Sequence, residues 1–398
     1  MKKLKTQKGI TLIALVITII VMLILVAVTI SMAINGGLFE KAGKATGDTR
    51  NAMNAEQALA SGQITIDGKT YASIDDYLAG KEAMLTYNEA TKENGFLTVK
   101  ARYESDGKTA IIPKGFKIIE DAEGKKSIDA GLVIQDKKGN EFVWIPVTND
   151  LGSSYSYQGS SSEEYSEPTE LTGTWDKSTN TPKPKYDSQE ILDELYGTDN
   201  PYTYSTDFKY AEEYAEMVRC VNANHGFYIG RYETTVDDEG NIGSKYNTTV
   251  LTAGTTLFTK DSTNYPYRWY GLYYTSKNAN VTGNGTDVQT AMIYGVLWDK
   301  TMDFIRTQKA AGKTTFDVDV VNLSRHNVSA NSGQANSGDV ALNIWDLESN
   351  AMEWTQEADI SAYRVCRGFF GCASNRVNTA IPTYDETGLS SRIALYIK

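Results

Sequence analysis

The longest apolar run in the chain covers residues 10–34, ITLIALVITIIVMLILVAVTISMAI, and contains no charged side chain. A helix of that length, at about 1.5 Å rise per residue, is roughly 37 Å long and can cross a bilayer. Residues 1–9 before it hold four lysines and no acid. The positive-inside rule therefore assigns this end to the cytoplasm and the bulk of the chain to the outside. A cleaved secretory signal has an apolar core of only about 7–15 residues. The pattern predicts a basic cytoplasmic leader at 1–9 and a retained single transmembrane helix at 10–34.

Residues 35–104 lack a comparable apolar pattern. Residues 35–62 are rich in Ala, Lys and Glu, which is typical of a solvated helix. Residues 63–74 form two short β-prone runs around Asp67-Gly68 and predict a hairpin. We therefore expect a stalk or linker between the membrane and the domain beyond it.

Residues 105–398 follow a pattern of short strands, turns and a few helices, which predicts an α+β domain. Apolar, β-branched runs bounded by turn residues predict strands at 109–113, 131–135, 141–147 and 226–233.

Helical spacing of apolar positions is found in three further segments of this domain. It predicts helices at 188–196, 207–223 and 287–307. Residues 152–206 are dominated by Ser, Tyr, Thr, Gly and Pro, which predicts an exposed, irregular insertion around the first of these helices.

Composition excludes several classes of partner and of site. The chain has 398 residues, with 39 Lys and Arg against 50 Asp and Glu and a formal net charge of −11. Subtracting the four leader lysines from 39 leaves 35 basic against 50 acidic residues for the remainder. This acidic balance argues against nucleic acid, because a phosphate backbone requires a basic surface. Three cysteines and two histidines argue against a disulfide scaffold and a multi-histidine metal centre.

The start of the chain resembles a type IV prepilin leader, through Lys8-Gly9 followed by Ile10-Thr11-Leu12-Ile13. In that family a peptidase cuts after the glycine and the exposed residue is N-methylated, which the resemblance carries to Gly9 and Ile10. The family usually has a glutamate at the fifth position after the cut, where this chain has Ala14. Without that carboxylate, the N-terminal amine would lack a partner in hydrocarbon. This departure disfavours assembly into a filament. The resemblance leaves a pilin-like structural subunit as the alternative to a plain signal anchor in a bacterial cell membrane.

Five short motifs occur in order along residues 105–398. They resemble those of the formylglycine-generating enzyme (sulfatase-modifying factor) superfamily, and the resemblance implies a C-type-lectin-like domain over this whole portion. The motifs are FVWIPV at 142–147, GFYIGRYE at 226–233, NAMEWT at 350–355, YRVCRG at 363–368 and ALYIK at 394–398.

The enzymes of this superfamily bind copper with two cysteines separated by four residues, and soft thiolates suit Cu(I). Alignment on Arg367-Gly368 puts these positions at Ala373 and Asn378, and neither is cysteine. Cys366 and Cys372 are displaced from them and separated by five residues. We therefore expect no copper, and either a local disulfide or two separate thiols suits this pair. Formylglycine formation on a sulfatase cysteine is the alternative function.

The superfamily also binds calcium around the segment that matches residues 346–354. The resemblance implies side-chain oxygens from Asp346 and Glu353 and backbone carbonyl oxygens from Ser349 and Ala351. Calcium takes six to eight hard oxygens, which this spacing can supply together with waters. In the alternative, Asp346 and Glu353 are surface carboxylates.

The C-terminal segment 367–392 mixes aromatic, amide, hydroxyl and charged residues without a helical or strand period. Rigid aromatics with adaptable amides are typical of adaptable binding surfaces. Several lectin-like members of the superfamily are targets of diversity-generating retroelements, which vary the equivalent segment. The residues that we expect to contact a ligand are Phe369, Phe370, Asn375, Arg376, Asn378, Tyr384 and Asp385.

These observations together predict a single-pass protein with an extracellular domain at 105–398. Its function is expected to be binding of an extracellular ligand, protein or glycan, by a catalytically inactive fold of the formylglycine-generating type. Calcium is the one cofactor that the resemblance supports.

Overall fold

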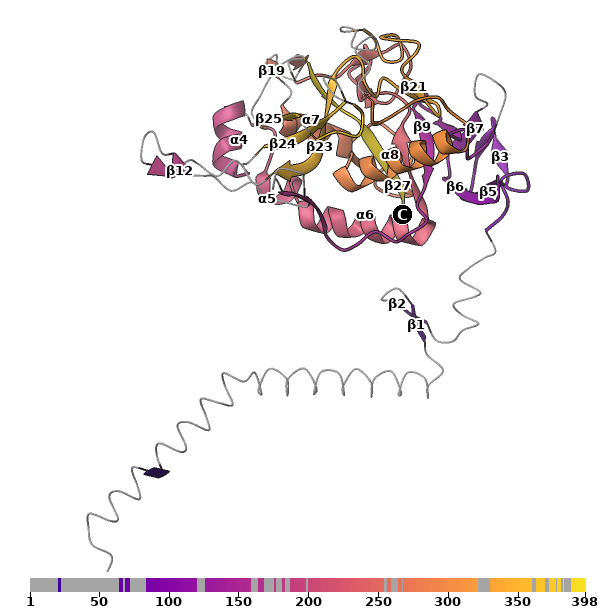
Figure 1. Ribbon diagram of the computed structural model, residues 1–398, viewed down its shortest axis with the longest axis horizontal. Helices are drawn as coiled ribbons and strands as arrows, with labels where there is room; N and C mark the ends of the chain where they lie inside the picture. Colours follow the sequence, from indigo (N-terminus) through magenta and orange to yellow (C-terminus); the bar gives the residue numbers. More distant parts are fainter. Residues whose placement is uncertain are drawn as a thin grey trace, which may run out of the picture. The chain divides into compact units, whose positions relative to one another are not determined.

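The computed structural model of the protein divides into two compact units, Met1–Ala83 and Met84–Lys398, and each is considered by itself (Figure 1). The residues that it describes are 21–22, 64–66, 69–71, 84–119, 126–158, 164–167, 175–176, 181–182, 187–197, 200–253, 256–258, 264–266, 268–320, 330–359, 363–368, 372–376, 378–380, 382 and 388–398.

The first unit contains one described hairpin. β1 (Ile64–Ile66) pairs antiparallel with β2 (Lys69–Tyr71), which confirms the hairpin predicted around residues 67 and 68.

The predicted transmembrane helix falls almost entirely outside the described residues. Val21 and Met22, in its middle, are helical and exposed. The rest of residues 10–34 and the predicted processing site at Gly9 and Ile10 are not among the residues described. Within the described part of the chain, no helix combines the length and apolarity needed to cross a membrane.

The second unit begins at Met84, earlier than the predicted boundary at residue 105. Leu97 and Ala101 are buried in the same apolar cluster as the later strands. The end of the predicted linker therefore belongs to the folded domain. Its strands are two antiparallel pairs, β3 (Lys92–Glu93) with β4 (Phe96–Leu97) and β5 (Ala101–Ser105) with β6 (Lys108–Ile112).

A six-stranded sheet in the order β20-β27-β14-β9-β8-β7 organises the second unit (Figure 1). All of its neighbouring strands are antiparallel, and the last strand of the chain, β27, lies between β20 and β14. The strands predicted at 109–113, 131–135, 141–147 and 226–233 are confirmed as β6, β8, β9 and β14. The sheet consists of β7 (Phe116–Ile119), β8 (Val133–Asp136), β9 (Glu141–Pro146), β14 (Gly226–Gly230), β20 (Val288–Met292) and β27 (Ile393–Ile397).

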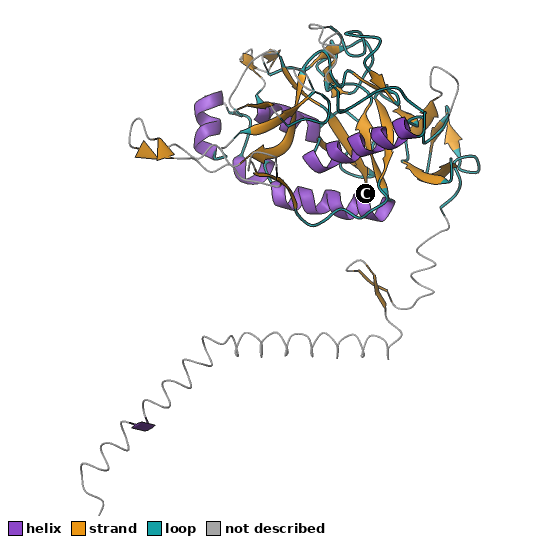
Figure 2. Cartoon of the chain, in the orientation of Figure 1, coloured by secondary structure: helices purple, strands orange, loops and turns teal. Residues whose placement is uncertain are grey.

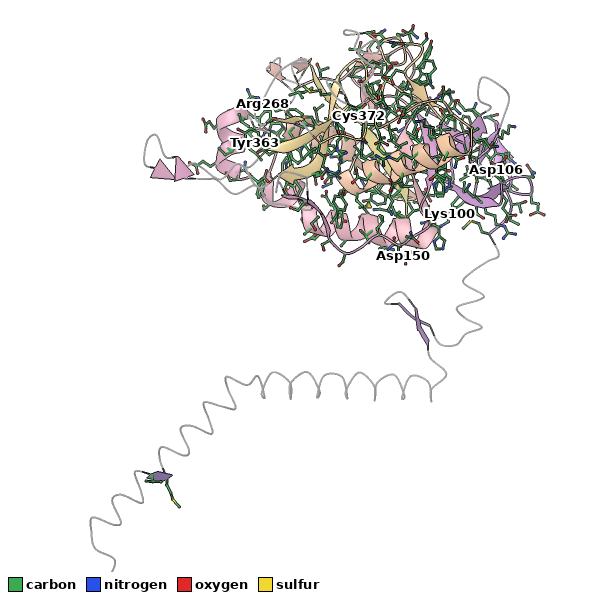
Figure 3. All side chains as sticks on the ribbon, viewed as in Figure 1. Lys100, Asp106, Asp150, Arg268, Tyr363 and Cys372 are labelled. Carbon is green, nitrogen blue, oxygen red and sulfur yellow. The ribbon has the colours of Figure 1, made fainter. Side chains whose placement is uncertain are left out.

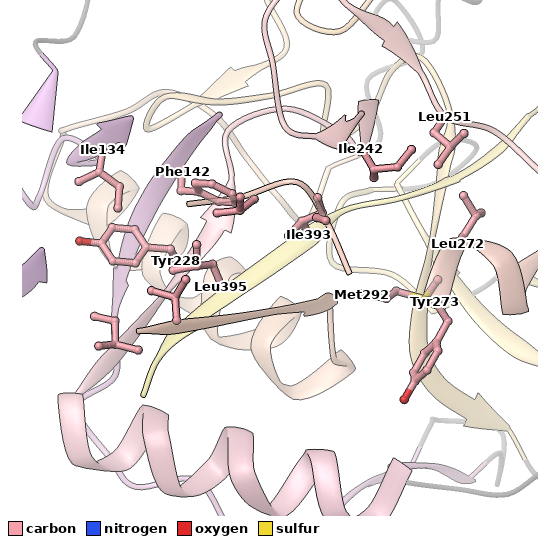
Figure 4. Close-up of a cluster of buried hydrophobic side chains, with 14 of the residues drawn as sticks. Ile134, Phe142, Tyr228, Ile242, Leu251, Leu272, Tyr273, Met292, Ile393 and Leu395 are labelled. Atoms are coloured by element: carbon pink, nitrogen blue, oxygen red, sulfur yellow. The ribbon is translucent and has the colours of Figure 1, made fainter. Parts of the chain in front are cut away.

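Both faces of this sheet are buried. Successive side chains of a strand point to opposite faces. Phe142 and Trp144 of β9 accordingly join one apolar cluster, and Val143 and Ile145 join a second. Figure 4 shows part of the first cluster, where Tyr228 of β14 lies beside Phe142. Burial on both faces explains why these strands are nearly continuous apolar runs.

Three helices cover the sheet. α6 (Tyr210–Asn224) and α8 (Gly295–Ala310) contribute to the cluster of Val143, and α7 (Trp269–Lys277) contributes to the cluster of Phe142. The helix predicted at 207–223 is confirmed as α6. Figure 2 distinguishes these helices from the strands that they cover.

The helix predicted at 287–307 is wrong in its first part. Residues 288–292 form β20, which pairs along its whole length with β27, and α8 begins only at Gly295. The β-branched Val288 and Thr290 suit a strand. The backbone partner that β27 offers comes from the far end of the sequence, so local spacing could not reveal it.

A second six-stranded sheet has the order β10-β11-β23-β24-β25, with β26 parallel to β23. β10 and β11 come from the predicted insertion at 152–206, which is therefore not wholly irregular, since β11 pairs with β23. The sheet consists of β10 (Tyr155–Gln158), β11 (Glu164–Glu167), β23 (Met352–Asp359), β24 (Arg364–Arg367), β25 (Asn378–Ala380) and β26 (Leu389–Ser391).

Two helices and several short strand pairs complete the described elements. The helix predicted at 188–196 is confirmed as α4 (Gln189–Tyr196), and the Ser188 hydroxyl accepts a hydrogen bond from the Ile191 N–H as its N-cap. The others are α5 (Tyr204–Asp207), β12 (Trp175–Asp176) with β13 (Thr181–Pro182), β15 (Thr235–Val236) with β16 (Ile242–Gly243) and β17 (Thr249–Val250), β18 (Thr256–Phe258) with β19 (Asn264–Pro266), and β21 (Val340–Ala341) with β22 (Ile344–Trp345).

Candidate functional site

The five motifs of the sequence lie on neighbouring strands. β9, β14 and β27 are adjacent in the first sheet, and β23 pairs with β24 in the second. Most of their apolar residues are core residues of this fold. The polar residues next to these strands are therefore the candidates for a functional site.

The turn that leads into β23 is built around buried carboxylates. Asp339 Oδ2 accepts hydrogen bonds from the Glu348 N–H at 2.8 Å and from the Ser349 hydroxyl at 2.7 Å. Asp346 Oδ2 accepts one from the Gly333 N–H at 2.6 Å. These carboxylates satisfy buried donors of an irregular turn that has no regular backbone ladder. Both carboxylates are therefore part of the buried interior of this turn.

Two glutamates close the other side of this turn. Glu233, three residues after the end of β14, accepts hydrogen bonds from Asn350 Nδ2 at 2.6 Å and from the Ala351 N–H at 3.2 Å. Glu353, on β23, faces Arg392, whose Nε lies 3.0 Å and 2.9 Å from the two carboxylate oxygens. Asp346 and Glu353 are each only 1% exposed, so the alternative of surface carboxylates is wrong.

Burial changes the proton affinity of these acids. It raises the pKa of Asp346 to about 6, although the hydrogen bond from the Gly333 N–H lowers this pKa. It raises the pKa of Glu353 to about 7, although the guanidinium of Arg392 opposes the rise. The pKa of Glu233 is raised well above its usual value by burial and then by the charges of Asp346 and Glu353.

The carboxylate that the resemblance assigns to calcium at Glu353 is paired with a cation of the protein itself. Both carboxylate oxygens of Glu353 are hydrogen-bonded to Arg392. Across the described ranges, no group of three or more His, Cys, Asp or Glu side chains is arranged to hold a metal ion.

A second buried charge cluster lies beneath the C-terminal segment. Glu357 of β23 accepts hydrogen bonds from Arg367 at 2.9 Å and from Arg376 at 2.5 Å. Both arginines also form ion pairs with Asp299 of α8, and the distance from Arg367 is 3.1 Å. The hydroxyl of Tyr155 in β10 is hydrogen-bonded to Asp299 and to Arg376. Arg376 is thus a buried anchor rather than an exposed ligand contact, because its guanidinium is committed on several sides.

The stretch 372–376 is held at both backbone and side chains. Trp298 Nε1 of α8 donates to the Ala373 carbonyl at 2.8 Å, and the Ser374 N–H donates to the Val318 carbonyl at 3.0 Å. Arg367 Nη1 donates to the Ser374 carbonyl at 3.0 Å. The centre of the predicted binding segment is therefore fixed on α8 and the second sheet.

The other predicted contact residues have mixed placements. Asn375 is half-buried, and its N–H donates to the Cys372 carbonyl at 3.0 Å. Asn378 begins β25 and lies opposite Cys366 of β24. The remaining four lie outside the described residues: Phe369, Phe370, Tyr384 and Asp385.

The cysteines are separate thiols. Cys220, Cys366 and Cys372 are all free and buried (Cys372 is labelled in Figure 3), which decides against the local disulfide. Burial raises the pKa of the Cys366 thiol, and burial also raises that of Cys220. A raised pKa disfavours the thiolate that metal binding and nucleophilic chemistry require.

Comparison with protein-family models, with curated proteins and with solved structures gives no match to this chain. What the protein does is therefore inferred from its own residues.

Sequence reasoning missed Arg392, Glu357 and Asp299. Asp299 and Arg392 are separated by tens of residues from their charged partners, and Glu357 by 10 and 19 residues, so no helical or strand period links these pairs. The one local signal is at Arg392, a single charged residue directly before the apolar run of β27, and charged residues are rarely buried unless they are paired.

Proposed function

We propose that the protein is a membrane-anchored, surface-exposed ligand-binding protein with a C-type-lectin-like domain, and that the C-terminal segment 367–392 contacts the ligand. The observation that carries the proposal is the anchoring of residues 372–376 by the cluster of Arg367, Arg376, Glu357 and Asp299. A segment that is held in place before binding loses less conformational entropy when the ligand arrives.

The composition of the segment supports a macromolecular ligand, a protein or a glycan. It offers aromatic rings for stacking and amides and hydroxyls for hydrogen bonds. Its anchor residues are charged, but their charges are paired with one another, so we expect its aromatic, amide and hydroxyl residues to determine specificity.

The thiols support binding rather than oxidase chemistry. The superfamily's enzymes activate oxygen with copper that a pair of thiolates holds. In this protein the thiols of Cys366 and Cys372 are buried, and burial raises the pKa of Cys366. The apolar run at 10–34 and the lysines before it support the membrane anchor and the outward orientation of the domain.

The experiment uses the full chain, purified in detergent micelles and labelled. It is screened on arrays of glycans and of purified extracellular proteins, and the affinity for any ligand found is measured for variants. Tyr384→Ala and Asp385→Ala are expected to weaken binding at least about tenfold, about 1.4 kcal/mol.

Tyr246→Ala is the matched control, because this tyrosine is 53% exposed and lies outside the segment. It is expected to bind as the wild type does. Equal loss in the control and in the segment variants would contradict the proposal. So would formylglycine in a sulfatase peptide incubated with copper and the full chain.

A further inference from the structure

A cavity of about 190 Å³ lies between the chain that follows β9 and the second half of α8. Its volume is that of about six water molecules at ~30 Å³ each. Its apolar lining includes Val147 and Phe304, which are buried in the same cluster. Thr148, Asn149 and Thr307 also line it and are exposed, so the cavity is open to solvent. A small site with apolar walls and a few polar groups suits one polar ring.

Gln308, in the last turns of α8, brings an unsatisfied amide to this cavity. Its side chain lines the cavity and is 2% exposed, and its Oε1 accepts no hydrogen bond from any described residue. Other buried polar groups of α8 are satisfied, since Trp298 Nε1 donates to the Ala373 carbonyl at 2.8 Å. A buried acceptor without a donor destabilises the fold. An O–H or N–H group of a ligand in the cavity would satisfy it.

Lys300 brings a positive charge to the same cavity. The other charged lining residues have counter-ions: Lys108 pairs with Asp129, and Asp303 pairs with Arg306 at 2.8 Å. Lys300 is half-buried, and within the described part of the chain no acid forms an ion pair with it. An anionic group that enters the cavity would therefore meet one uncompensated cation.

These two residues restrict the chemistry of the ligand. A simple carboxylate or sulfate can pair with Lys300 but has no hydrogen to donate to Gln308 Oε1. A neutral sugar can donate to Gln308 but leaves Lys300 without a counter-ion. An amine would be repelled by Lys300. The ligand that suits both residues carries a carboxylate and a hydroxyl group on one small ring.

We propose that this cavity binds the terminal uronic acid residue of a glycan. The carboxylate pairs with Lys300, a hydroxyl donates to Gln308, and the C–H face of the ring packs on Phe304. The exposed residues at the edge leave room for the rest of the glycan in solvent. The site shares no residue with the C-terminal segment 367–392, so it is a second binding site in addition to the ligand contact proposed above.

The test measures binding of D-glucuronate to the purified full chain by ligand-observed NMR, in a detergent without a sugar headgroup. The wild type is expected to bind with a Kd on the order of 1 mM. Acetate carries the charge alone and glucose the hydroxyls alone, so each should bind at least about tenfold more weakly. A disaccharide that ends in glucuronate should bind more tightly than the free sugar, because its second ring reaches the exposed edge.

Three results would overturn the proposal. Acetate that binds as well as glucuronate would mean an adventitious anion only. Glucose that binds as well would remove the role of Lys300. No glucuronate bound at about 20 mM would mean that water alone fills the cavity. A disaccharide that binds no better than free glucuronate would contradict the glycan end as the ligand.

Variants test the two residues separately. Lys300→Gln should lose the preference for glucuronate over glucose. Gln308→Leu should weaken both sugars at least about tenfold without lowering Tm, because an apolar side chain of similar size removes the unsatisfied amide. Lys114→Gln, which changes an exposed lysine outside the cavity, is the matched control and should bind as the wild type does.

Asp385→Ala separates this site from the C-terminal segment, and it should bind glucuronate as the wild type does. Unchanged glucuronate affinity in folded Lys300→Gln or folded Gln308→Leu would contradict the site. If Gln308→Leu does not fold, Lys300→Gln decides, since it changes only a half-buried side chain.

Discussion

Glu357 joins two arginines with one carboxylate. Its Oε2 accepts from Arg367 and its Oε1 from Arg376, and all three side chains are buried. Desolvation makes such a pair costly to break, because the remaining charge is left in a medium that solvates it poorly. By contrast, Arg306 pairs with Asp303 and Asp319 at the surface, where water screens the charges.

We therefore predict that Arg376→Ala lowers the free energy of unfolding by about 3 kcal/mol, whereas Arg306→Ala lowers it by no more than about 1 kcal/mol. Denaturant titration measures both values. Hydrogen exchange should also become faster at residues 372–376 in Arg376→Ala alone. Equal losses in the two variants would show that the buried cluster does not anchor this stretch.

The raised pKa of Asp346 makes stability depend on pH. Burial raises this pKa from 3.8 to about 6, so the folded state holds a proton that the unfolded state releases between these values. The contribution of Asp346 to stability should therefore fall by about 3 kcal/mol as pH rises from about 4 to about 6, and this contribution should be constant above that range.

Asp346→Asn should flatten that part of the profile, because the amide cannot titrate but retains an oxygen for the Gly333 N–H. The control is Asp237→Asn. The ion pair with Lys245 lowers the pKa of Asp237 despite burial, so this carboxyl titrates below about pH 4 and its removal should leave the slope between pH 4 and 6 unchanged. Denaturant titrations across this pH range give the measurement. An unchanged slope in Asp346→Asn would contradict the assignment.

Among the elements, β14 packs closely against its neighbour β9. A Cβ added at Gly226 would lie 2.3 Å from Trp144 Cζ2 and 2.8 Å from the Ile145 carbonyl oxygen. Trp144 is fully buried in β9, so it has little room to move. The glycine therefore permits the close approach of β14 and β9.

We predict that Gly226→Ala destabilises the domain by about 1–3 kcal/mol through overpacking. Gly388→Ala is the matched control, because nothing lies within 4 Å of its added Cβ. It should leave stability unchanged within about 0.5 kcal/mol. Melting temperatures of the two variants decide, and a stable Gly226→Ala would mean that β14 and β9 can separate at little cost.

For the whole molecule, the division at Ala83 and Met84 separates the acidic folded domain from the basic, apolar start of the chain. We predict that residues 84–398 produced alone unfold in one cooperative transition and stay in the supernatant after ultracentrifugation of the cell extract. The full chain should sediment with the membranes and resist extraction by high salt. Full chain in the supernatant would contradict the predicted anchor at 10–34.

The sequence by itself determined the strands that have a strong local pattern. β8, β9 and β14 are runs of apolar residues bounded by turns. A strand that is buried on both faces of its sheet needs such a run, whatever its position in the sheet. The cap of α4 by Ser188 is equally local. Separate thiols were one of two open alternatives, because a pairing depends on distances that spacing does not give.

Only the tertiary structure decided the pairings between distant residues. β20 is a strand because β27 lies beside it, although its own spacing suits a helix. Arg392 meets Glu353 because the ends of two sheets converge there, and Arg376 is an anchor because Glu357 and Asp299 face it. In each case the stabilisation comes from pairing of desolvated charges or from backbone hydrogen bonds between strands that are distant in the sequence. Such terms depend on position in space and leave no period in the sequence.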